Sequence, residues 1–78
     1  MIKHLIVDRD DFSVYRDWMK SRGFISATYF SVTGFDLKKM KKLAEDGQLN
    51  AISCSVGKSV KLYYSESQTE LAHLRGLV

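Results

Sequence analysis

Six lysines between residues 34 and 64 are the side chains whose types and spacing offer the clearest chemistry. Four of them alternate with apolar residues at helical spacing, which predicts a helix with one apolar stripe and one basic face. Ammonium groups gathered on one face are suited to binding phosphate oxygens, and this segment holds six of the twelve basic residues of the chain. The candidate phosphate-binding residues are Lys38, Lys39, Lys41 and Lys42 on the predicted helix and Lys58, Ser59 and Lys61 in the segment that follows.

Three other patterns suggest chemistry that their surroundings do not support. Gly57-Lys58-Ser59 matches the end of a phosphate-binding P-loop, but Ile52 stands where that loop requires its first glycine. Asp8 follows an apolar run, as in phosphoacceptor receiver domains, yet that doubly wound fold needs more than 78 residues. The two histidines and the single cysteine are too scattered to form a metal or nucleophile motif. We therefore expect no enzyme activity, no metal, no cofactor and no small-molecule substrate.

The elements that position the lysines begin with an N-terminal strand and helix. Ile2 to Val7 reads as a short strand, and the aspartates after it supply caps for a helix from about Asp11 to Arg22 that ends at Gly23. A turn and a short helix near Ala27 to Val32 follow, and Gly34 breaks the chain. The expected inward stripe of the first helix is Phe12, Tyr15, Trp18 and Met19.

The lysine helix has a start signal, a stop signal and a predicted hairpin behind it. Asp36 is placed to cap its first turn, and Gly47 stands where a left-handed residue ends a helix. Two strands joined by a three-residue loop, Gly57 to Ser59, would share one continuous apolar face. That register pairs Val56 with Val60, Cys54 with Leu62 and Ile52 with Tyr64, and it turns Ser53, Ser55, Lys61 and Tyr63 outward.

Composition sets limits on the class of protein. A chain of 78 residues, 45% apolar and 27% charged, with a net charge of +3, fits one small domain spanning residues 1–78. Four Phe, four Tyr and one Trp are more than so small a core buries easily, which favours a homodimer or a protein partner. One cysteine excludes an internal disulfide, and no apolar run reaches the length of a membrane span. We expect a cytoplasmic protein that does not enter membranes.

The spacing from Gly34 to Leu74 resembles the winged-helix domains of the excisionase and MerR families. Met40 and Leu43 fall six and nine places past Gly34, where those families have aliphatic residues, and the segment from Gly47 to Ile52 matches their entry into the wing. Phe30, Thr33 and Asn50 depart from the family pattern. The resemblance implies that the Asp36 to Asp46 helix lies in the DNA major groove and that the Gly57 to Ser59 wing touches the backbone.

We therefore expect an α+β fold, a small winged helix-turn-helix domain with a two- or three-stranded antiparallel sheet. Residues 34–64 would form the recognition helix and wing, and residues 1–23 an N-terminal strand and helix added to them. The expected function is double-stranded DNA binding, as a small transcriptional regulator or an excisionase-like accessory factor. The alternative is a protein interaction module that uses the aromatic-rich N-terminal half, which Glu45 and Asp46 favour because they would repel phosphates.

Overall fold

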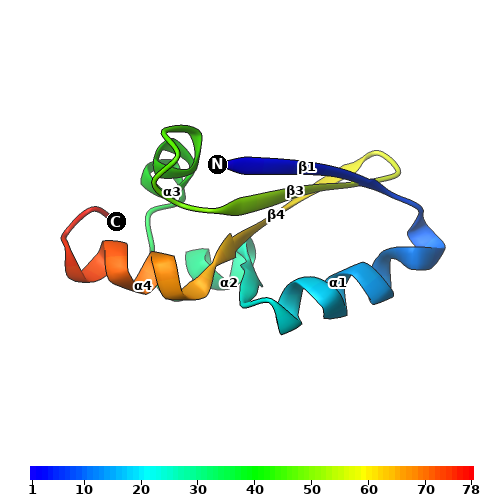
Figure 1. Ribbon diagram of the computed structural model, residues 1–78, viewed down its shortest axis with the longest axis horizontal. Helices are drawn as coiled ribbons and strands as arrows, with labels where there is room; N and C mark the ends of the chain where they lie inside the picture. The colour runs from blue at the N-terminus through cyan, green and yellow to red at the C-terminus, as the bar shows by residue number, and fades with distance from the viewer.

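A four-stranded mixed sheet with helices on both faces forms the centre of the computed structural model, which describes residues 1–78 (Figure 1). The strand order is β1-β3-β4-β2, with β1 parallel to β3 and β4 antiparallel to both β3 and β2. The elements are β1 (Ile2–Val7), the 3-10 turn η1 (Arg9–Asp11), α1 (Phe12–Ser21), β2 (Phe24–Ser26), α2 (Ala27–Val32), α3 (Leu37–Glu45), β3 (Ala51–Val56), β4 (Ser59–Ser65) and α4 (Glu66–Leu74).

The expectation of an α+β fold is confirmed, and the details of the sheet are corrected. The expected two- or three-stranded antiparallel sheet is wrong, because β2 adds a fourth strand and β1 runs parallel to β3. A parallel pair needs a long crossover connection, and here three helices and β2 lie between β1 and β3 in the chain. The hairpin expected to be a wing is therefore the centre of the sheet.

Helix boundaries follow the local signals in the sequence. Asp36 caps α3, and its Oδ1 accepts hydrogen bonds from the backbone N–H groups of Lys38 at 3.0 Å and Lys39 at 3.3 Å. Gly47 follows the helix with φ +83°, and the N–H of Gln48 donates to the carbonyl of Leu43. The short helix expected from Ala27 to Val32 is α2, whereas β2 before it had no counterpart in the expectation.

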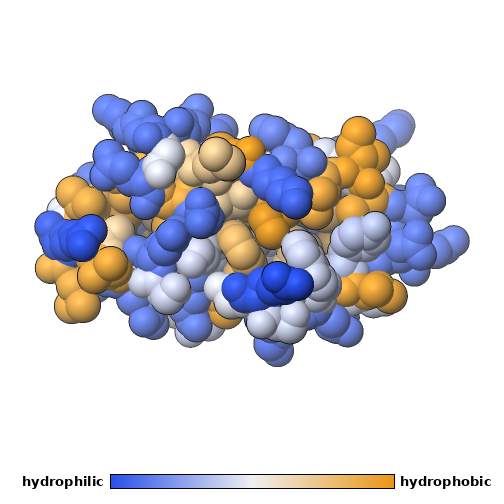
Figure 2. All heavy atoms as spheres, viewed as in Figure 1, coloured by the Kyte–Doolittle hydropathy of each residue, from blue (hydrophilic) through white to orange (hydrophobic).

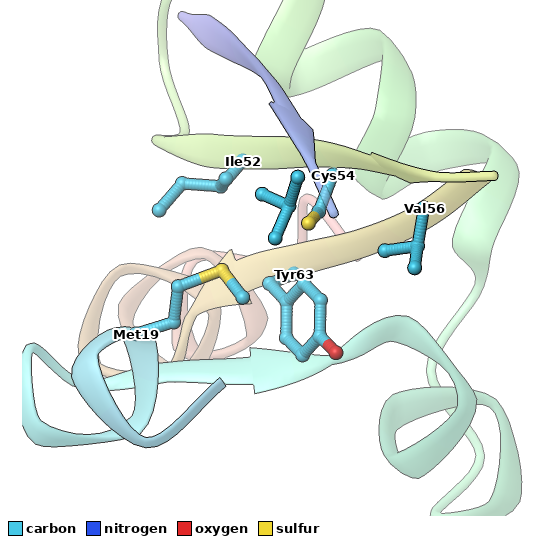
Figure 3. Packing of buried hydrophobic residues seen from close by; sticks show 6 residues of the cluster. Met19, Ile52, Cys54, Val56 and Tyr63 are labelled. Carbon is cyan, nitrogen blue, oxygen red and sulfur yellow. The ribbon is translucent and has the colours of Figure 1, made fainter. Parts of the chain in front are cut away.

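The two faces of the sheet carry two separate hydrophobic cores. Between α1 and the sheet, Met19 points toward Tyr63 and Ile52, and Cys54 and Val56 lie in the same core (Figure 3). Val7 also belongs to this core. The helices α2, α3 and α4 cover part of the opposite face. The buried residues of that second core are Phe30, Met40, Ala44, Leu49, Ala51 and Tyr64.

The expected hairpin register is wrong by one residue on β4. The strands are joined by the two-residue turn Gly57-Lys58, so that Val56 lies opposite Ser59 and Cys54 opposite Lys61. Gly57 has φ +59° and Lys58 no positive φ, which fits a type II′ turn with glycine first. Tyr63, expected outward, is buried on the α1 face, because both faces of the hairpin are covered and neither needs to be wholly polar.

The apolar stripe of α1 is only partly buried. Met19 is fully buried and Phe12 packs against the same core, as expected. Tyr15 and Trp18, expected to point inward, are 41% and 39% exposed. The stripe is wider than the contact of one helix with one sheet face, so its flank remains at the surface.

A chain that begins at Phe24 should fail to fold. It lacks β1 and α1, which contribute Val7 and Met19 to the first core, and it would expose the apolar side chains of β3 to water. Full burial of each such side chain is worth about 1.5–3 kcal/mol, a large part of the net stability of a small domain. Circular dichroism and thermal melting should show no cooperative transition for the shortened chain. A cooperative melt near the full-length temperature would contradict the role given to residues 1–23.

Two substitutions within α1 provide a matched test of the same core. Met19→Ala should lower the free energy of unfolding by about 2–5 kcal/mol, because it leaves a cavity at a fully buried site. Val14→Ala, on the same helix at a site 68% exposed, should change it by less than about 0.5 kcal/mol. Urea titrations of the two variants measure the difference, and equal values would show that α1 does not pack as described.

Candidate nucleic-acid interface

The lysine helix α3 is fixed to the second core by its apolar face. Met40 and Ala44 are fully buried, and the side chains of Leu37 and Leu43 pack beside them. The turn before the helix is held by Phe35, whose ring lies 5.5 Å from that of Phe30 in an edge-on arrangement. The helix is thus presented by the fold in one orientation.

All four lysines of α3 are exposed, and none forms an ion pair. The chain has a single ion pair, 3.8 Å between Arg16 Nε and Asp17 Oδ1 on α1. Lys38 and Lys42 lie opposite the buried stripe, and Lys39 and Lys41 flank them. Figure 2 shows hydrophilic side chains along the upper edge of the molecule, over α3. This lysine face of α3 is a cationic surface whose charges are not neutralised within the protein.

The other three predicted site residues lie apart from the lysine face. Lys58 is in the β3–β4 turn and Ser59 starts β4, at the opposite end of the long axis from α3 (Figure 1). Lys61 lies on the α1 face of the sheet, with its Nζ 5.6 Å from the ring centroid of Phe12, a cation–π distance. The seven residues therefore do not form one continuous surface, and a contact made by α3 would involve its own four lysines.

One surface feature was missed in the sequence. Val14, Tyr15 and Trp18 of α1 line a hollow with Lys3 and Leu5 of β1, at the edge of the sheet. The breadth of the α1 stripe was the available signal, because a helix that packs against one sheet face buries only part of so wide an apolar surface. This hollow gives the N-terminal half an apolar surface distinct from the lysine face.

The helices α2 and α3 contact each other and are joined by a short turn, residues 33–36. The N–H of Phe35 donates to the carbonyl of Phe30 at 2.9 Å, which closes the end of α2.

No group of three His, Cys, Asp or Glu side chains is placed to hold a metal ion, and no helix has the length and apolar character to cross a membrane. Comparison of the chain with protein-family models, curated proteins and solved structures gave no match.

Cys54 should react slowly with a thiol reagent in the folded protein. Burial raises the pKa of its thiol, and the nearby Lys61 ammonium offsets only part of that effect. Its side chain is fully buried, so reaction requires local opening and should be about 100-fold or more slower than in denaturant. In a Ser59→Cys variant the added thiol, at an exposed site, should react fast while Cys54 stays slow. Rapid loss of both thiols in the native state would contradict the burial of Cys54.

Proposed function

We propose that the protein binds double-stranded DNA through the lysine face of α3. The observation that carries the proposal is the set of four exposed lysines without acidic partners, on a helix whose other side is fixed in a core. Ammonium groups held in this way can neutralise phosphates and release the counterions bound to DNA. The helix-turn-helix order of α2 and α3, and the resemblance to the excisionase and MerR families, add support.

The chemistry of α3 favours phosphate contacts over base reading. The helix holds no arginine, asparagine or glutamine, the side chains that most often bind guanine or adenine bidentately. Lysine contacts to phosphates orient a protein on the duplex but carry no sequence information. Sequence preference would then need a second copy or a partner, as in a small transcriptional regulator or an excisionase-like accessory factor. We also propose the cytoplasmic location expected from the sequence.

Lys42→Ala should weaken binding on all duplex sequences alike. Removing one phosphate contact should flatten the slope of log affinity against log salt concentration by about one unit. Fluorescence anisotropy titrations on a generic duplex, at several salt concentrations, measure this slope. The same charge change at Lys58, at the other end of the molecule, provides the matched control and should leave the slope unchanged. A slope that responds to Lys58→Ala and not to Lys42→Ala would refute the lysine face as the interface.

The second candidate function is a protein interaction module, and the exposed rings of Tyr15 and Trp18 beside the apolar hollow favour it. Glu45 and Asp46 at the end of α3 also favour it, because they would repel phosphates. The titration separates the two functions, since an interaction module should show no duplex binding at low or high salt. A binding curve that Trp18→Ala leaves unchanged but Lys42→Ala weakens would favour DNA binding.

A further inference from the structure

We infer that β1 is the contact strand of a symmetric dimer, in which two copies of the chain join their sheets edge to edge. The β1 strand is an outer strand of the sheet and pairs only with β3. It is six residues long, and the chain contains no proline that would block pairing at its free edge. An edge strand with unpaired backbone groups is a template for a further strand.

The direction of the backbone groups along β1 follows from one hydrogen bond. The N–H of Ala51 donates to the carbonyl of Met1 at 2.9 Å, so Met1 points its carbonyl toward β3. Because successive residues of a strand direct these groups to alternate sides, Ile2, His4 and Ile6 point theirs to the free edge. Pairing with a second chain would therefore use groups that the monomer leaves without a protein partner.

The side chains on this strand are complementary to those of a second, antiparallel copy. If Ile6 lies opposite Ile6 of the second copy, His4 lies opposite Asp8 of the second copy, and Leu5 lies opposite Val7. Asp8 continues the extended backbone with φ −68° and ψ 145°. Its N–H can join the ladder, whereas its carbonyl already accepts from the N–H of Asp11 at 3.0 Å, so the ladder ends at this residue. The strand carries Lys3 and His4 at one end and meets Asp8, Arg9, Asp10 and Asp11 at the other. Arg9 turns its guanidinium to Gly57 of the β3–β4 turn, and the three carboxylates leave this end with a net negative charge. Reversing the second copy therefore sets opposite charges beside each other, which selects a second copy as the occupant of the edge.

The same register buries apolar surface that the monomer leaves exposed. Ile6 is 94% exposed on the sheet face away from α1, beyond the part that α2, α3 and α4 cover. Figure 2 shows hydrophobic side chains at the end of the sheet where β1 and the hairpin turn lie. On the other face, Leu5 lies at the edge of the hollow lined by Val14, Tyr15 and Trp18, which the second copy would close. Both faces of the new strand pair thus gain apolar contacts.

Proline at position 6 tests the contact without disturbing the monomer. The outward N–H of Ile6 makes no bond within the chain, and an edge strand tolerates proline where its N–H faces solvent. The full-length protein should sediment at twice its 8.9 kDa mass at high concentration, and Ile6→Pro should sediment as a monomer with an unchanged circular dichroism spectrum. Ile6→Val, which keeps the N–H and a branched side chain, should remain dimeric. A wild-type protein that is monomeric at every concentration, or an Ile6→Pro dimer, would overturn the inference.

Two cysteine variants test the same contact if Ile6→Pro does not fold. Opposed residues in a hydrogen-bonded antiparallel pair have Cα atoms about 5.5 Å apart, a distance that a disulfide spans. Ile6→Cys should therefore form a covalent dimer on mild oxidation. Val60→Cys, exposed on the same face but two strands away on β4, should not. Both variants retain the buried Cys54, so only the position of the added thiol differs. Equal cross-linking at the two positions would overturn the proposed contact.

Discussion

Ala51 and Ile52 are neighbours in the chain and lie in different cores, and this division of β3 between two faces is the constraint on which the rest of the structure depends. Because alternate side chains of β3 and β4 point to opposite sides, each face needs its own covering helix. The first core requires α1, and the second requires the helices around α3. The N-terminal strand and helix are therefore as necessary to the hairpin as the helices that cover its other face.

The parts of the fold that the sequence predicts well are those governed by neighbouring residues. Asp36 caps α3 with its own side chain, and Gly47 ends the helix with a positive φ, so both boundaries need no knowledge of the rest of the chain. The hairpin register could not be fixed in the same way. The expected register assumed that the hairpin face carrying Tyr63 is in water. In the structure α1 covers that face. Gly57, as the first residue of a two-residue turn, is the local signal that fits the observed register.

For the candidate site, too, the sequence predicts features within one element better than the distance between elements. Helical periodicity correctly predicts that Met40 is buried and that Lys38 and Lys42 are exposed, because both statements concern one helix. The distance between α3 and Lys58 depends on the direction that the chain takes from α3 into β3. No local sequence pattern determines that direction. The sheet carries the turn to the far end of the molecule and places Lys61 on the face opposite α3. DNA contact by α3 is thus a proposal about four lysines, and the wing residues do not extend it.

The parallel pairing of β1 with β3 also determines when the protein can fold during its synthesis. During synthesis the first strand and α1 emerge from the ribosome before the central strands exist, since a chain is made from its N-terminus. Val7 and Met19 have no complete core to enter until residues 51–64 have been translated. Pairing between segments so distant in sequence slows folding, because a long loop must close first. The apolar side chains of β1 and α1 therefore stay without their packing partners until both central strands have been made.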